Sequence, residues 1–472
     1  MKSQHKKPLH IYFALFTGLT LAMGSCKKFV EIPPPVNQLT AATVFSSDAT
    51  ASAAIAGIYS RLSQSGFIQA ITPYAAMYAD ETVNYEPGNQ GEFALSQLTR
   101  ISSPALNTNF WNLGYQYIYF ANAAIGELNT GSGVSPALKA NLTGEAKFIR
   151  AYLYLNLSSL FGDVPLITDT RYQSNATFPR SPKAQVMQFI IEDLKEAVEL
   201  LGEQTGGEKV RANRYAAMAL LARAYLYNGE WALAQQSANA VIESKKYTML
   251  TDPSKVFLKN SSEAILQLYP TQTNQNTPDG LTFLPATAAE QPKYVITPAL
   301  LSAFEPADLR KSAWIASRIF LGQSYAYPAK YRVINTSVLS EYLMVLRLAE
   351  QYLIRGEARI QLGDIENGIA DLNVIRKRAR PAPAPTLPNP VPDLSGSISK
   401  AEALLAMEKE RQTELMCEMG HRWLDLQRTG RADKILKAVK PDTWTATAIL
   451  WPIPEEQLRL NPFLEQNPGY NK

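Results

Sequence analysis

Two segments of the chain share one pattern of small residues, and this pattern limits the fold more than any other feature. Residues 216–242 and 352–375 each contain two helix-length apolar stretches, and a glycine followed by an acidic residue separates the two stretches. Small residues let antiparallel helices approach closely where they cross, and glycine tolerates the backbone of the turn. Aligning the turn glycines pairs Gly229 with Gly363, Ala222 with Gly356, and Ala234 with Gly368. The segments are therefore predicted to be two copies of one helical hairpin.

The spacing within these hairpins is that of a tetratricopeptide repeat, whose helix pairs stack into a scaffold with a surface for a partner protein. Helix-spaced apolar residues predict helices at Ala49–Ser63, Asn107–Leu128, Lys139–Leu160, Lys183–Leu201, Arg211–Asn228, Trp231–Ser244, Leu343–Gln361, Ile365–Ala379 and Ser399–Thr429. Loops are predicted at about 247–340, with a strand-like run at 263–268, and at the proline-rich residues 380–398. We predict a mostly α-helical fold: a tetratricopeptide-like scaffold with irregular ligand-binding loops and few short strands.

The N-terminus has the anatomy of an export signal. Three lysines precede an uncharged, mostly apolar run at residues 11–24, which is shorter than the ~20 apolar residues of a membrane span. Two small residues stand directly before Cys26, an arrangement that resembles the lipobox of bacterial lipoproteins, in which this cysteine is lipidated. We predict a signal peptide at 1–25, a lipidated, proline-containing tether at 26–36 and a single body at 37–472. The alternative is an ordinary signal peptide with a chance cysteine.

Histidine and cysteine are scarce, which limits the possible chemistry. Two of the three histidines leave with the predicted signal peptide, so a zinc site of several histidines is excluded and a Ser-His-Asp triad could form only around His421. Because the other cysteine is Cys26, Cys417 has no partner for an internal disulfide and is expected to be a buried small hydrophobe. We predict no catalytic residue, no metal ligand and no cofactor, although chemistry by carboxylates alone remains open.

The net charge argues against nucleic acid as a partner. The formal charge of the whole chain is +4, and the predicted cleavage removes three lysines and no acid, which leaves +1. Binding to nucleic acid calls for a clustered basic face, which a nearly neutral chain does not indicate.

Residues 410–428 are rich in both carboxylates and arginines. Glu410, Glu414 and Glu418 are spaced four residues apart, so they would share one face of a helix, and arginines are interleaved with them. A general acid–base pair would need carboxylates that flank an open cleft, whereas interleaved arginines favour ion pairs. We therefore predict a structural network of ion pairs in this segment.

Several motifs together resemble the SusD/RagB family of nutrient-binding outer-membrane lipoproteins. They follow one another along nearly the whole chain after the lipobox: Glu145–Tyr152 with Leu160–Leu166 (LFGDVPL), Leu346–Leu353 with Leu372–Ala379, Glu410–Leu415 with Gly420–Arg428 (GHRWLDLQR), Pro452–Pro454, Asn461–Pro462 and Gln466–Tyr470. The resemblance implies a non-enzymatic, lipid-anchored protein of the outer membrane, exposed at the cell surface. It also implies that the protein binds an oligosaccharide and delivers it to a TonB-dependent, SusC-like transporter.

Three other functions stay open at this stage. RagB-type members of the family bind peptides, and the net charge does not separate a peptide from a glycan. The second alternative is an enzyme, a glycoside hydrolase that uses carboxylates alone. A scaffold that binds only a protein is the third.

The ligand site is expected in loops where aromatic rings and polar groups are mixed, because sugar rings stack on Trp and Tyr while their hydroxyls bond to amides and carboxylates. Two stretches have this mixture, residues 73–85 and 314–327. Trp111 resembles a position where members of the family place a stacking tryptophan. The predicted ligand-binding residues are Tyr74, Tyr78, Asp80, Asn84, Tyr85, Trp111, Trp314, Tyr325 and Tyr327. The alternative for Tyr78, Trp111 and Trp314 is a place in the core.

Overall fold

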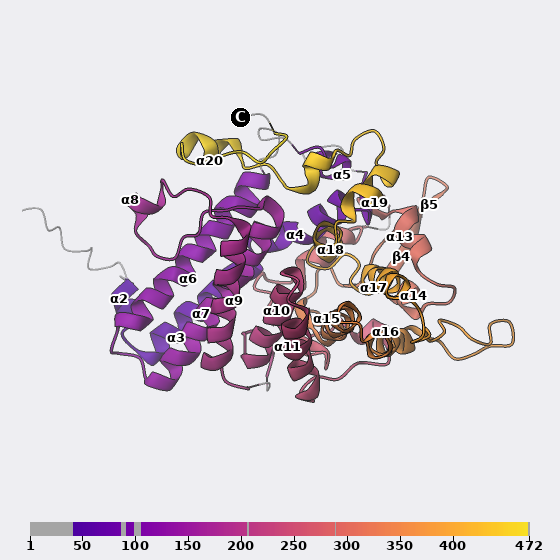
Figure 1. The fold of residues 1–472 in the computed structure, drawn as a ribbon, viewed down its shortest axis with the longest axis horizontal. Helices are drawn as coiled ribbons and strands as arrows, with labels where there is room; N and C mark the ends of the chain where they lie inside the picture. The colour runs from indigo at the N-terminus through magenta and orange to yellow at the C-terminus, as the bar shows by residue number, and fades with distance from the viewer. Residues whose placement is uncertain (1–40, 86–90, 99–104, 205–206, 288, 471–472) are drawn as a thin grey trace, which may run out of the picture.

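The computed structural model describes residues 41–85, 91–98, 105–204, 207–287 and 289–470, so the predicted signal peptide, Cys26 and the tether lie outside the described residues. Long helices form a row across the molecule (Figure 1). They are α3 (Asp48–Ser63), α6 (Leu113–Thr130), α7 (Pro136–Phe161), α9 (Lys183–Leu200), α10 (Arg214–Tyr227), α11 (Trp231–Glu243), α15 (Leu348–Gln361) and α16 (Ile365–Ala379). The predicted mostly helical scaffold is confirmed.

The two predicted hairpins are α10 with α11 and α15 with α16, and they stack directly on one another. Helix α11 packs against α15 although residues 244–347 separate them in the sequence. The turn glycines Gly229 and Gly363 have φ of +74° and +93°, a left-handed backbone that glycine adopts without strain. At the crossing of α15 and α16, a Cβ on Gly368 would lie 2.9 Å from the carbonyl oxygen of Gly356. Small residues at this crossing are therefore a requirement of the close packing.

Shorter elements cover the ends and one side of this row. The helices are α2 (Ala41–Val44), α4 (Gly66–Tyr78), α5 (Gly91–Leu95), α8 (Tyr172–Asn175), α12 (Pro278–Phe283), α13 (Pro298–Ala303), α14 (Leu309–Trp314), α17 (Lys400–Glu414), α18 (His421–Arg428), α19 (Ala432–Val439) and α20 (Glu455–Leu460). A π-helical turn, η2 (Leu106–Asn112), precedes α6, and 3-10 turns occur at η3 (Pro253–Lys255) and η4 (Ala446–Ile449).

The strands of the described residues form three antiparallel pairs. The first pair is β1 (Thr82–Asn84) with β3 (Tyr294–Ile296), in which Thr82 faces Ile296. The second is β2 (Ala264–Leu268) with β6 (Leu343–Arg347), and the third is the hairpin of β4 (Ile315–Phe320) with β5 (Gln323–Pro328). The strand-like run predicted at 263–268 is confirmed as β2.

Three predicted elements differ from the structure. The helix predicted from Leu343 begins only at Leu348, because 343–347 is the wholly buried strand β6. The helix predicted at 399–429 is broken into α17 and α18, since Cys417, Met419 and Gly420 all have positive φ. The first predicted ligand loop, 73–85, lies mostly in or just after helix α4, which continues through Pro73.

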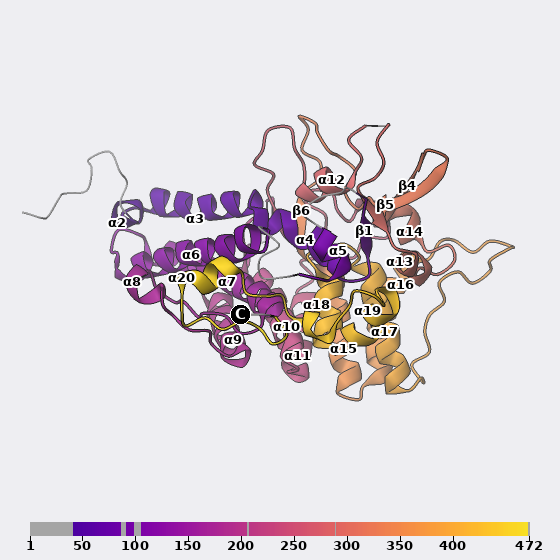
Figure 2. The same ribbon diagram turned by 90° about the horizontal axis from the view of Figure 1, so that it is seen from above.

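The irregular elements gather on the side of the row where the site lies. In Figure 2, α12, β1, β4 and β5 lie along one edge of the molecule, and α9, α11 and α15 lie along the opposite edge. Most buried apolar side chains belong to one continuous cluster that extends from Phe45 to Leu464. The loops that carry the site are therefore mounted on a single packed body.

Candidate functional site

An open cleft of about 690 Å³ lies where the two predicted aromatic stretches meet. Its lining residues come from strands β1 and β3, from helices α13 and α14, and from the β4–β5 hairpin. The lining residues are Val83, Tyr85, Val295, Ile296, Pro298, Leu301, Ala307, Asp308, Lys311, Ser312, Ile315, Ser317, Gln323, Ser324, Tyr325 and Ala326. The cleft therefore combines an apolar floor, two tyrosines, hydroxyls, an amide and two charged groups.

Local backbone pairing places Tyr85 at the rim of the cleft. It follows β1, and its N–H donates to the carbonyl oxygen of Lys293 at 2.8 Å, which extends the β1–β3 ladder by one residue. At the other end of the strand, the N–H of Thr297 donates to the carbonyl oxygen of Glu81 at 3.0 Å. This ladder holds the Tyr85 ring 52% exposed.

The β4–β5 hairpin brings Tyr325 against Tyr85. Its two-residue turn, Leu321–Gly322, has φ of +48° and +80°, and this turn type matches the twist of antiparallel strands. The ring centroids of Tyr85 and Tyr325 are 5.6 Å apart and their planes meet at 79°, an edge-to-face contact. The Tyr325 hydroxyl donates to Oε1 of Gln323 at 3.1 Å. The two predicted stretches thus contribute one tyrosine each to a single aromatic pair.

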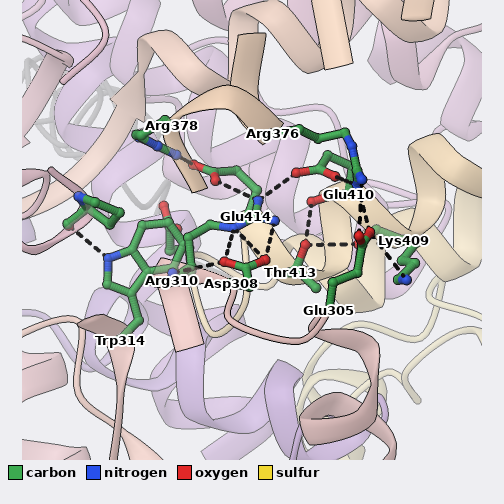
Figure 3. Close-up of polar contacts among 12 residues, drawn as sticks. Glu305, Asp308, Arg310, Trp314, Arg376, Arg378, Lys409, Glu410, Thr413 and Glu414 are labelled. Atoms are coloured by element: carbon green, nitrogen blue, oxygen red, sulfur yellow. Dashed lines mark hydrogen bonds and ion pairs between the residues drawn. The ribbon is translucent and has the colours of Figure 1, made fainter. Parts of the chain in front are cut away.

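The structure places three predicted stacking residues in the core and not at the cleft, which is the alternative that the sequence left open for them. Trp314, which is labelled in Figure 3, is fully buried. Its Nε1–H donates to the Pro253 carbonyl at 2.9 Å, and its ring faces the Lys330 ammonium. Trp111 packs edge-to-face on Phe161, with centroids 5.2 Å apart. The buried Tyr78 hydroxyl donates to the carbonyl of Ala448 at 2.7 Å. A ring that is covered on both faces offers no platform to a sugar.

The remaining predicted residues do not line the cleft. Tyr74 is buried in α4 and stacks on Phe93 at 4.4 Å. Asp80 is also buried, and both of its carboxylate oxygens accept hydrogen bonds from Arg422 at 2.7 Å. Asn84 is half-buried in β1, and Tyr327 is buried in β5. Of the nine predicted residues, Tyr85 and Tyr325 are those that line the cleft.

Sequence reasoning missed three residues that line the cleft: Asp308, which caps α14, and Lys311 and Ser312 within it. An aspartate before a short polar run is a helix-capping signal, and Asp308 does accept a hydrogen bond from the backbone N–H of Arg310 at 2.9 Å. That signal predicts the start of a helix, but not which side of the helix faces a ligand.

A buried network of ion pairs lies behind the α14 wall (Figure 3). Arg310 bonds to Asp308, Glu410 and Glu414, and Glu414 also pairs with Arg347 and Arg378. Burial alone would raise the pKa of Glu414, but the three arginines hold it well below the usual range. The prediction of a structural ion-pair network in 410–428 is confirmed, and its carboxylates are closed off from the cleft.

The single histidine of this region is also buried. Burial lowers the pKa of His421 to about 4, against the opposing effect of Glu350. Cys417 is a buried free thiol, as predicted. In the part of the chain that the structure describes, no three His, Cys, Asp or Glu side chains are grouped as a metal would need. Within the same residues, no helix is long and apolar enough to cross a bilayer.

The fold and site thus define a class: a helical-repeat scaffold that carries an open, tyrosine-lined cleft in its loops. A family model described as starch-binding associating with outer membrane matches residues 29–226, and the model of the SusD family matches residues 323–470. The chain belongs to the SusD family.

Relatives and solved structures agree with this membership over nearly the whole chain. A SusD-like protein, P38, of Formosa agariphila is 25% identical over 98% of this chain and 99% of its own length. A SusD-like protein of Bacteroides ovatus is 30% identical over 52% of this chain and 47% of its own length. A crystal structure of a SusD superfamily protein from Bacteroides vulgatus, 26% identical, has a TM-score of 0.74 and covers 90% of this chain and 100% of its own. A laminarin-binding SusD-like protein, 23% identical, has the same TM-score and the same coverage.

Proposed function

We propose that this chain is a cell-surface lipoprotein that binds an oligosaccharide in the cleft and delivers it to a TonB-dependent, SusC-like transporter. The observation that carries the binding proposal is the Tyr85–Tyr325 pair, in which Tyr85 is exposed and Tyr325 is half-buried, at a cleft lined by hydroxyls and an amide. The C–H faces of sugar rings stack on such rings, and sugar hydroxyls exchange hydrogen bonds with serine and glutamine side chains. The match to a family model described as starch-binding and the similarity in fold to a laminarin-binding protein support a glycan rather than a peptide.

Binding without turnover is part of the proposal. Glycoside hydrolysis by carboxylates alone requires a pair of acids about 5–10 Å apart that face the substrate. Among the described residues that line the cleft, Asp308 is the only acid, and Arg310 engages both of its oxygens. The cleft of the described residues therefore lacks a carboxylate pair, and we expect incubated glycans to be recovered unchanged.

The proposed anchor and partner use other parts of the chain. Lipid on Cys26 would attach the protein to the outer membrane, so Cys26→Ser should release it from the membrane fraction of cells. The side of the helix row opposite the loops (Figure 2) would be available to a transporter while the cleft holds its ligand. An unchanged membrane fraction for the Cys26→Ser variant would contradict the lipid anchor.

The binding proposal is tested by removing the two tyrosine rings of this pair. The full-length protein in detergent would be screened against laminarin, starch and other oligosaccharides and against peptides, and the best ligand titrated by calorimetry. We expect Tyr85→Ala and Tyr325→Ala each to weaken binding by about 1–3 kcal/mol, the scale of stacking on an aromatic platform. Tyr172→Ala is the matched control, because Tyr172 is 81% exposed on α8 and lies outside the cleft.

Removing the exposed Tyr85 ring should leave the melting temperature close to that of the wild type, and removing the half-buried Tyr325 ring should lower it only slightly. Wild-type affinity in both cleft variants would rule out this site. Peptide affinity without glycan affinity would favour the RagB-type alternative, and the appearance of shortened glycan would contradict binding without turnover.

A further inference from the structure

The charged groups of the cleft are not balanced. Among its described lining residues two side chains carry charge, Asp308 and Lys311, and they lie three residues apart on either side of the start of α14. Whether the cleft presents a net charge to a ligand depends on which of these groups is already neutralised within the protein.

Both carboxylate oxygens of Asp308 already accept hydrogen bonds from Arg310. Its Oδ1 accepts hydrogen bonds from the backbone N–H and the Nε–H of Arg310, at 2.9 and 3.1 Å, and its Oδ2 accepts from the guanidinium at 2.7 Å. The side chains of both residues are 2% exposed. Asp308 therefore offers a ligand neither uncompensated charge nor a free acceptor.

Lys311 is in the opposite situation. Its side chain is exposed, and its ammonium donates to the carbonyl oxygen of Leu301 at 3.4 Å, which places the charge at the wall of the cleft. Among the described residues no carboxylate lies within 4.0 Å of this ammonium. The ammonium has three N–H donors, so further acceptors can bind beside the carbonyl.

The other polar lining groups are neutral. Ser312 follows Lys311 on α14, and Ser317, Gln323 and Ser324 line the cleft from the β4–β5 hairpin. Hydroxyls and an amide can bond to sugar hydroxyls and also to the oxygens of a carboxylate or a sulfate. The lining side chains of the described residues thus leave one unmatched positive charge at the cleft.

We infer that the cleft prefers oligosaccharides that carry an anionic substituent, a uronate carboxylate or a sulfate ester, and that Lys311 recognises it. This inference rests on the proposed glycan-binding function and names the class of glycan. A lysine ammonium is a compact point charge on a flexible stem, so either anion can be accommodated, whereas a fixed arginine fork favours planar, bidentate partners. The interaction weakens with added salt, because the ammonium is exposed and is screened over ~10 Å at 0.1 M ionic strength.

Matched glycan pairs test the inference on the full-length protein in detergent. Oligogalacturonate would be compared with its methyl ester, and a sulfated galactan oligosaccharide with its desulfated form, by calorimetry at 50 and 500 mM salt. We expect the anionic member of at least one pair to bind about 10- to 100-fold more tightly at low salt, the range of a hydrogen bond to a charged group. The pair that shows the preference identifies the anion as carboxylate or sulfate.

Variants assign the preference to one side chain. Lys311→Met, which keeps the stem and removes the charge, should reduce the affinity for the anionic glycan to that for its neutral partner, and Lys311→Arg should restore most of the preference. Lys400→Met is the matched control: Lys400 is exposed, its ammonium also donates to a backbone carbonyl, that of Gln361 at 2.7 Å, and it lies outside the cleft. This control should keep the wild-type preference.

The outcomes separate the inference from the function on which it rests. Equal affinity for the anionic and neutral members of both pairs, or a preference that survives Lys311→Met, would overturn the inference while glycan binding stands. If no glycan of either kind binds under any condition, the proposed function fails, and the inference fails with it.

Discussion

Asp80 and Glu81 are neighbours in the sequence, yet their side chains meet very different surroundings. Asp80 forms a two-point ion pair with Arg422. Glu81 is also buried, but its carboxylate accepts a hydrogen bond from the backbone N–H of Cys417 at 2.9 Å, and no basic group of the described residues lies within 4.0 Å of it. Burial therefore raises the pKa of Glu81 to about 8, so the native protein holds this proton at neutral pH.

The raised pKa makes stability depend on pH in a defined direction. An unfolded Glu81 loses its proton near its ordinary pKa of 4.5, whereas the native side chain keeps it to about pH 8. The free energy that this protonated carboxyl contributes to stability is fully present below pH 4.5 and is lost as pH rises from 4.5 to 8. Above pH 8 the free energy no longer changes with pH. We expect Glu81→Gln, which cannot ionise, to gain stability relative to the wild type across this window, on the order of 1.4 kcal/mol per pH unit crossed.

Urea denaturation of both proteins at pH 4.5, 6 and 8 measures this gain. Glu196→Gln serves as the control, because Glu196 is 56% exposed and pairs with Lys147 at 3.3 Å, and its difference from the wild type should not change with pH in this way. A Glu81→Gln difference that stays constant from pH 4.5 to 8 would show that the native carboxyl does not hold its proton.

The sequence predicted which stretches meet at the site, but not which rings are exposed there. Residues 73–85 and 314–327 mix aromatic and polar residues, and they do converge at the cleft. Whether a ring is covered, however, depends on distant partners: the Tyr78 hydroxyl bonds to Ala448, and Trp314 faces Lys330. A tyrosine or tryptophan suits either setting, because it combines a large apolar face with a polar tip.

At the scale of elements, the amphipathic helices and their hairpins were predictable because their signals are local. The spacing of apolar residues defined α10, α11 and α16 to within a few residues of their ends. The predicted helix includes strand β6, because the short apolar run Leu343–Leu346 has no periodicity that separates a buried strand from a buried helix. Helix α4 was missed because Pro73 lies within it, and proline normally breaks helices.

The crossing of α15 and α16 yields a prediction about packing. A Cβ on Gly368 would lie 2.5 Å from Cγ1 of Ile360 and 2.9 Å from the carbonyl oxygen of Gly356, so part of one helix backbone would have to move. We expect Gly368→Ala to destabilise the protein by about 1–3 kcal/mol, the range of overpacked cores. Chemical denaturation, followed by the circular dichroism of the helices, measures the loss.

Gly126 provides the matched control in another helix. It lies exposed within α6, and a Cβ there would meet nothing within 4 Å. Because alanine has the higher helix propensity, Gly126→Ala should stabilise the protein by up to about 1 kcal/mol. If both substitutions had the same sign, the close approach at the hairpin crossing would not be a determinant of stability.

At the scale of the whole molecule, the buried ion pairs join the ligand cleft to the repeat scaffold. Glu414 at the end of α17 pairs with Arg310 of α14, Arg347 of β6 and Arg378 of α16. Arg310 in turn holds Asp308 in the wall of the cleft (Figure 3). The sequence predicted a network within 410–428 from its interleaved charges, but these arginines stand 36 to 104 residues before Glu414, and no local pattern identifies such partners.

Breaking the buried ion pairs of Glu414 should destabilise the protein far more than breaking a surface ion pair. Glu414→Gln keeps the shape of the side chain but leaves three buried guanidinium groups without their shared carboxylate, which we expect to cost about 3–5 kcal/mol of unfolding free energy. Glu243→Gln breaks an exposed pair with Lys245, whose ammonium lies 3.2 Å away, and a longer contact of 3.9 Å with Arg355, and should cost at most about 1 kcal/mol. Urea denaturation at 50 and 500 mM salt distinguishes the two sites, since salt screens the exposed pair but hardly reaches the buried one. A loss below 1 kcal/mol for Glu414→Gln, or one that added salt abolishes, would mean that the network does not hold the cleft to the scaffold.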